Sequence, residues 1–157
     1  MKTPAAYRSA IIEGLFARIK SLVLALHRHD RLETAQDFNG WFERLTENRE
    51  EIADIALHMT LRAIHVASEP TNFRLLQRLQ REQTVSLRSL MNTTGMSRVP
   101  VHDRINTLMQ AGLAVQELES DDVRITPLGE GVVRWLEELI HDLERSIYQW
   151  LNEGKER

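Results

Sequence analysis

SLRSLMNTTGMSRVPVHDRINTLMQAGLAVQELESDDVRITPLGEG, residues 86–131, is the stretch that decides the fold of this 157-residue chain. Leu87, Leu90 and Met91 repeat at helical spacing, and Ser86 or Thr84 stands where the N-cap of such a helix is expected. The pattern stops at Gly95, and glycine adopts a positive φ without steric penalty. The sequence therefore predicts a short helix that ends in a tight turn.

A second helix is predicted immediately after the turn, over about residues 97–111. Ser97 is its expected N-cap, and Pro100 falls in the first turn, where a missing N–H is tolerated. Its inward residues lie on one face: Val101, Ile105, Leu108 and Met109. A polar row at four-residue spacing lies on the other face: Arg98, His102 and Asn106. One buried face and one exposed polar row are typical of a helix that presents side chains to a partner.

Two short strands should follow. Gly112 ends the preceding helix, and apolar and polar residues alternate on both sides of an acidic turn at residues 119–122. Thr126 and Pro127 then start another helix. Helix, turn, helix and hairpin, in this order, form a winged helix-turn-helix, which lays one helix in a nucleic-acid groove.

Long amphipathic helices flank this module. Helices are predicted over about residues 4–29, 34–68 and 127–153, with residues 73–79 as the first helix of the module; whether the second long helix bends or splits near residues 47–49 is left open. The predicted fold class is mainly α. A helical extension (1–69) precedes a winged helix-turn-helix with a two-stranded wing (70–130), and a C-terminal helix (131–157) follows. The apolar faces of both extensions are broader than a monomer needs, so we expect a homodimer; an ordinary helical core in a monomer is the alternative.

Composition excludes several functional classes. The chain has no cysteine, which removes disulfides, thiolate zinc sites and thiol catalysis. Its longest apolar run, Leu22–Leu26, is far shorter than the roughly 20 residues of a membrane span, and the N-terminus lacks a signal-peptide pattern. Phosphate-binding glycine loops, nucleophile–base pairs at motif spacing and evident carboxylate pairs are missing. We expect a cytoplasmic protein that is not an enzyme, binds no cofactor and does not associate with membranes.

Charge is distributed unevenly along the chain. Residues 71–104 carry six cations and two anions (+4), residues 105–157 carry −6 and residues 1–70 carry −1, within a net charge of −3. Basic charge is thus concentrated on the helices predicted to face DNA, as expected of a surface that contacts phosphates. Double-stranded DNA is the expected partner.

A resemblance to a known family supports this view. TTGMSRVPVHDRINTLMQAGLA (93–114) and DDVRITPLGEG (121–131) resemble the turn, recognition helix and wing of MarR-like transcriptional regulators, over about residues 73–131. The resemblance implies that the helix at 97–111 enters the major groove, that Arg124 touches the minor groove, and that a small-molecule effector could bind between the helical layer and the module. Two departures are an acidic wing and long helices before Pro70.

The predicted function is therefore a sequence-specific, DNA-binding transcriptional regulator that acts as a homodimer. The base-reading candidates form the polar row: Arg98, His102 and Asn106. The backbone and wing candidates are basic or hydroxyl residues: Arg74, Arg78, Ser86, Arg88, Ser97, Arg104 and Arg124. The acidic wing favours one alternative, a winged-helix protein–protein adaptor in a chromosome-organising or replication complex.

One further cluster has metal-ligating residue types. Asp54, His58, Arg62, His65 and Glu69 fall within about 80° of one another on a helix. Because Arg62 would repel a cation at the centre of this strip, we interpret it as a solvated polar face and predict no metal site.

Overall fold

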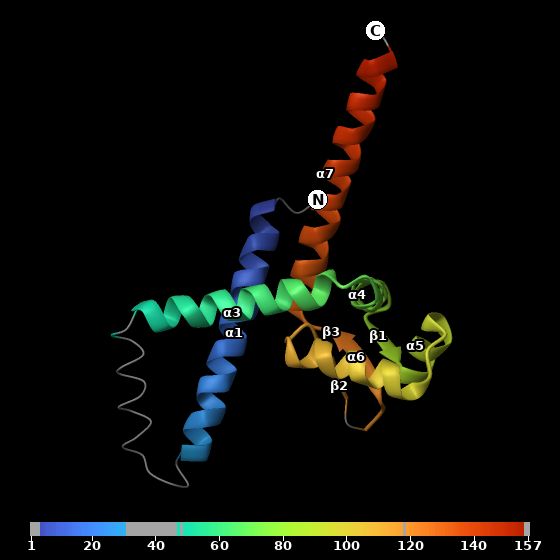
Figure 1. Cartoon of the computed structure of the whole chain (residues 1–157). Helices are drawn as coiled ribbons and strands as arrows, with labels where there is room; N and C mark the ends of the chain where they lie inside the picture. The colour runs from blue at the N-terminus through green and yellow to red at the C-terminus, as the bar shows by residue number, and fades with distance from the viewer. Residues whose placement is uncertain (1–3, 31–46, 48, 118, 156–157) are drawn as a thin grey trace.

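The computed structural model describes residues 4–30, 47, 49–117 and 119–155 (Figure 1). Its elements follow in the order α1 (Pro4–Asp30), α3 (Arg49–Ser68), α4 (Pro70–Glu82), β1 (Thr84–Ser86), α5 (Leu87–Thr94), α6 (Arg98–Gln110), β2 (Ala114–Gln116), β3 (Asp122–Ile125) and α7 (Pro127–Lys155). The fold is mainly helical with one small antiparallel sheet, which confirms the predicted winged helix-turn-helix.

The core of the module lies where α4, α5 and α6 meet the sheet (Figure 1). Its fully buried side chains come from all three helices and from the loop after α6: Leu76, Leu79, Leu90, Ile105, Leu108 and Leu113. Burial of one such side chain stabilises the fold by about 1.5–3 kcal/mol. This core fixes α6 by its inward face and leaves its opposite face outside.

The sheet has one strand more than the predicted two-stranded wing. Its order is β1-β3-β2, and β1 pairs with β3 through Val85 and Val123. The hairpin of β2 and β3 is the predicted wing. Strand β1 has only three residues between two helices, so no alternation pattern reveals it in the sequence.

The predicted turn and caps of the module are present. Gly95 has a φ of +67° and ends α5, while the Ser86 hydroxyl accepts a hydrogen bond from the amide of Ser89. Met96 is half-buried against the core. Ser97 occupies the N-cap position of α6, but its side chain makes no capping hydrogen bond. Its hydroxyl therefore makes no contribution to holding the first turn of α6.

Thr126 connects the end of α6 to the start of α7. Its hydroxyl donates to the carbonyl of Gly112 at 2.6 Å and accepts from the amide of Gly129 at 3.0 Å, so Thr126 is the N-cap predicted for this helix. Its own amide donates to the carbonyl of Leu113. The Gly-Leu end of one helix and the Thr-Pro start of the next are thus two halves of one joint.

Helix α1 packs along the first half of α7, as Figure 1 shows. The two backbones approach closely at Gly14, where an added Cβ would lie 2.7 Å from the Cβ of Leu128. Both helices have nearly the predicted bounds, whereas the described part of the second long helix is α3; most of its predicted N-terminal half, residues 34–46, and the question of a bend near 47–49 lie outside the described residues. No described helix is long and apolar enough to span a bilayer.

Candidate nucleic-acid interface

Helix α6 carries its polar row on the side opposite to the core. Val101, Ile105 and Leu108 are completely buried on the inner side. On the outer side Arg98 and His102 are exposed and Asn106 is half-exposed. The three predicted base-reading side chains are therefore brought together on one accessible face, anchored by three apolar residues.

His102 and Asn106 interact with each other along this row. Nδ2 of Asn106 lies 3.0 Å from Nδ1 of His102, one helical turn away. The amide donates to this ring nitrogen, which leaves Nε2 to carry the proton of the neutral imidazole. The pair thus leaves the N–H donor of His102 and the carbonyl oxygen of Asn106 for other partners, and both groups suit contacts to base edges.

The tip of the wing lies against the N-terminal ends of α5 and α6. Oδ2 of Asp121 is 3.8 Å from Nη2 of Arg98, and the backbone carbonyl of Asp121 accepts from the amide of Leu87 at 3.3 Å. A hollow of about 310 Å³ is lined here by Ser86, Arg88, Arg98 and Asp121, among others. Three of the predicted DNA contacts, Ser86, Arg88 and Arg98, therefore line one hollow beside an acid from the wing.

The wing arginine also has an acidic partner. Nη2 of Arg124, in β3, lies 2.6 Å from Oε1 of Glu117, the residue directly after β2. Both side chains are about half exposed, so the pair is accessible to solvent. A contact from Arg124 to a phosphate would have to replace this ion pair.

Arg104 faces away from the polar row, towards the start of α4. Its Nη1 is 2.6 Å from Oε2 of Glu69 and 3.1 Å from Oδ1 of Asn72, and Asn72 in turn donates to the carbonyl of Val66. Burial acts to raise the pKa of Glu69, but hydrogen bonds from the amides of Asn72 and Thr71 and the charge and hydrogen bond of Arg104 outweigh it and lower the pKa. Arg104 is thus a link between α6 and the joint of α3 with α4.

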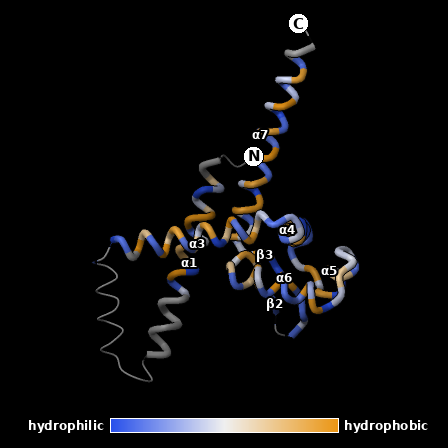
Figure 2. The backbone as a smooth tube through the Cα atoms, in the orientation of Figure 1, coloured by the Kyte–Doolittle hydropathy of each residue, from blue (hydrophilic) through white to orange (hydrophobic). Residues whose placement is uncertain are grey.

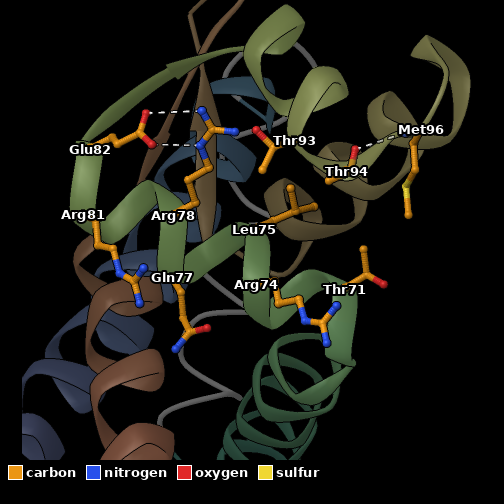
Figure 3. A pocket seen from close by; sticks show the side chains of 10 residues that line it. All are labelled: Thr71, Arg74, Leu75, Gln77, Arg78, Arg81, Glu82, Thr93, Thr94 and Met96. Atoms are coloured by element: carbon orange, nitrogen blue, oxygen red, sulfur yellow. Dashed lines mark hydrogen bonds and ion pairs between the residues drawn. The ribbon is translucent and has the colours of Figure 1, made fainter.

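Arg78 and Arg74 lie on α4, on the flank of the module. Nε of Arg78 is 2.9 Å from Oε1 of Glu82 (Figure 3). Its Nη2 donates to the hydroxyl of Ser89 at 2.6 Å, so the side chain ties α4 to α5. Arg74 lines a separate cavity, which we name the flank cavity. Ten residues line it: Thr71, Arg74, Leu75, Gln77, Arg78, Arg81, Glu82, Thr93, Thr94 and Met96. The predicted backbone contacts are therefore spread over several sides of the module.

Two arginines that are not among the predicted DNA contacts, Arg18 and Arg62, hold the C-terminal end of α6. Arg18 of α1 donates to the carbonyls of Met109 and Gln110, and Nη2 of Arg62 on α3 lies 3.2 Å from Oε1 of Gln110. Burial, and then the positive charge of Arg62, lower the pKa of Arg18. Cations at a helix C-terminus interact favourably with its free carbonyls. Residues 92 positions apart leave no signal of this contact in a local pattern.

The polar strip of α3 has no arrangement for a metal ion. Nδ1 of His58 interacts with the carbonyl of Asp54, and Glu69 is occupied by Arg104. Within the described ranges, no group of three or more histidine, aspartate or glutamate side chains could hold a metal.

Comparison with known families finds a match for the central part of the chain. Residues 68–115 match a family model described as winged helix-turn-helix DNA-binding. This segment is similar to winged helix-turn-helix DNA-binding domains. It runs from the end of α3 through α4, β1, α5 and α6 into β2, and leaves out α1, β3 and α7. No curated protein and no solved structure matches the chain significantly.

Proposed function

We propose that the chain is a sequence-specific transcriptional regulator that binds double-stranded DNA as a homodimer, with α6 in the major groove. The observation that carries this proposal is the polar row of Arg98, His102 and Asn106, exposed on a helix whose other face is completely buried. A helix held in this way can enter a groove without losing core contacts. The match of residues 68–115 to a DNA-binding family supports it.

The proposed contacts divide by position. Arg98 reads guanine, and the His102–Asn106 pair reads the next bases along the groove. Ser86 and Arg88 at the start of α5 and Ser97 at the start of α6 contact phosphates, because helix N-termini and free hydroxyls suit anions. Arg124 contacts the minor groove once a phosphate replaces Glu117. We assign Arg78 and Arg104 to positioning, since both are held by partners within the chain.

The dimer is proposed to form through the outer half of α7, residues 138–151. Figure 1 shows this half running past the rest of the fold, and Figure 2 shows apolar residues recurring along it. Leu139, Leu143, Ile147 and Trp150 are between 48% and 71% exposed and lie within about 80° of one another on the helix. A continuous apolar stripe of this kind marks an interface rather than a solvated surface. A second copy of α7 is the matching occupant, because a two-fold dimer also suits paired DNA half-sites.

A small-molecule effector belongs to the same proposal. A cavity of about 520 Å³ lies between α1 and the base of the wing, lined by small and apolar residues such as Ala10, Gly14, Val115 and Leu128. Its size suits a small ligand. Its position between α1 and the module is the one that the resemblance to MarR-like regulators implies.

Selection of bound sequences from random DNA, followed by affinity measurements on variants, tests the proposal. We expect recovery of an inverted repeat. Arg98→Ala should cost about 1–3 kcal/mol on that sequence and much less on random DNA, whereas Arg145→Ala, an exposed arginine of α7, should leave both unchanged. Failure to bind DNA at low salt, or a shallow dependence of affinity on salt, would contradict the proposal and favour the adaptor alternative.

A further inference from the structure

The flank cavity is large enough to hold a small molecule. It has a volume of about 650 Å³ and lies between α4 and the C-terminal end of α5 (Figure 3). Ligand cavities in proteins typically measure about 300–1,000 Å³. Its lining comes from α4, α5 and the turn after α5, and not from α6 or the wing. The flank cavity is thus separate from the hollow beside Arg98.

Positive charge at the flank cavity is only partly balanced. Arg78 is neutralised by Glu82 and hydrogen-bonded to Ser89. In the part of the chain that the structure describes, Arg74 and Arg81 have neither an ion pair nor a hydrogen bond. Two arginines without partners at a concave surface attract an anion, and each can donate two parallel hydrogen bonds to a carboxylate or phosphate.

The rest of the lining favours an organic anion over a bare ion. The half-buried Met96 provides apolar surface, to which Leu75, only 2% exposed, adds little. The hydroxyl of Thr93 donates to the carbonyl of Ser89 at 2.9 Å, so only its lone pairs remain for an occupant. The flank cavity therefore combines a cationic side with apolar surface, which suits a ligand whose anionic group is attached to an apolar body.

An occupant of the flank cavity would touch both α4 and the turn that connects α5 to α6. Arg74 and Leu75 belong to α4, whereas Met96 follows the turn at Gly95 and stands two residues before the start of α6. The amide of Met96 is held by the hydroxyl of Thr94 at 3.4 Å, a long hydrogen bond. A ligand bound between α4 and this segment would restrain the turn that sets the start of the recognition helix.

We propose that the flank cavity binds a small organic anion, a carboxylate or phosphate monoester on an apolar group, and that Arg74 and Arg81 recognise its charge. The inference goes beyond the proposed function and does not depend on it, because binding at this site requires no DNA.

Titration of the full chain with matched small probes tests this. Phenyl phosphate and 3-phenylpropionate are the two anionic arms, 3-phenylpropan-1-ol is the neutral control and inorganic phosphate is the control without an apolar body. We expect one or both organic anions to bind saturably, with a Kd of about 1 mM or below, and to shift the backbone amide NMR signals of Thr94 and Met96. Whichever anion binds identifies the preferred headgroup.

Variants make the result specific to the flank cavity. Arg74→Gln and Arg81→Gln should each weaken binding of the preferred anion roughly tenfold, while Arg145→Gln, an exposed arginine of α7 far from the cavity, should not. Equal binding of the alcohol, equal binding of inorganic phosphate, retained affinity in both glutamine variants, or amide shifts elsewhere would each overturn the proposal. So would loss of DNA affinity in Arg74→Gln without any binding of the small anions, since the cavity would then take a DNA phosphate.

Discussion

Single residues at the joint between α6 and α7 decide how closely the two helices meet. Gly129 accepts no side chain, because a Cβ built on its backbone would collide with the carbonyl oxygen of Leu113. The same carbonyl already accepts the amide of Thr126 and cannot move without breaking that bond. The need for glycine is therefore steric and has its origin in a neighbour 16 positions away.

Gly129→Ala should destabilise the chain by about 1–3 kcal/mol, the usual cost of forcing an atom into a packed site. Gly131→Ala is the matched control on the same helix. Its Cβ would lie 3.1 Å from Cγ1 of Ile11, 3.4 Å from the Ile11 amide nitrogen and 3.5 Å from the Cβ of Ala10, which are milder contacts than the collision at Gly129. Because alanine also favours the helix, we expect a clearly smaller loss. Urea unfolding measures both; similar losses in the two variants would contradict the steric explanation.

Glu69 makes the free energy of unfolding depend on pH. Its pKa is lower in the folded chain than the ordinary value of 4.5. Its contribution is therefore complete above pH 4.5 and disappears as the pH falls through the folded value. Because the Glu69 side chain is 41% exposed, solvent screening limits that contribution to about 0.5–1 kcal/mol.

Glu69→Gln should accordingly lower the free energy of unfolding at pH 7 and approach the parent chain at pH 3.5. Denaturant unfolding across this range gives the difference at each pH. Glu119→Gln, an exposed wing carboxylate, serves as the control and should show no such convergence. A difference between Glu69→Gln and the parent that stays constant with pH would contradict the role given to the charge.

At the scale of elements, the wing is attached to the start of α5, beside the predicted DNA contacts. Strand β1 pairs with β3 and leads directly into α5, and the carbonyl of Asp121 accepts from the first amide of α5. The backbone of Asp121 adopts a φ of +57°, a conformation that asparagine tolerates at least as well. The acidic tip is thus held beside Arg98 by backbone contacts that do not depend on its charge.

Asp121→Asn should therefore raise DNA affinity about two- to fivefold. It removes an exposed ion pair worth under about 1 kcal/mol, and with it a negative charge close to where phosphates would lie. Fluorescence anisotropy at fixed salt measures the change. Asp142→Asn removes the same charge from the far half of α7 and should have no effect; equal gains from both would show a general charge effect instead.

Local sequence predicted those elements whose structure local residues determine. Ser86, Gly95 and the alternating faces of α6 are each fixed by neighbours within a few positions, and the structure has them as expected. The contacts that depend on distant residues could not be predicted. The ion pair of Arg104 with Glu69 leaves no local signal because the two residues lie 35 positions apart, and β1 has too few residues to show a pattern.

At the scale of the whole molecule, the outer half of α7 carries the exposed apolar stripe through which we propose that two copies associate. Leu143→Asp places a charge at the centre of that stripe and should convert the proposed dimer to a monomer. His141→Asp, about 160° around the helix, adds a carboxylate on the opposite side and should remain dimeric. Sedimentation velocity distinguishes the two. A monomeric parent chain, or two variants with the same mass, would contradict the proposed interface.

The hydrogen bonds from Arg18 to the C-terminal end of α6 have a consequence for the spacing of the two DNA half-sites. Helix α1 touches α6 through this arginine and packs along α7, through which the two copies are proposed to meet. In the proposed dimer, α1 therefore helps to set the distance between the two copies of α6. Helix α1 lies outside the segment that matches the DNA-binding family model. We expect proteins with the same α6 but a different α1 to bind the same half-site sequence with a different spacing between the two half-sites.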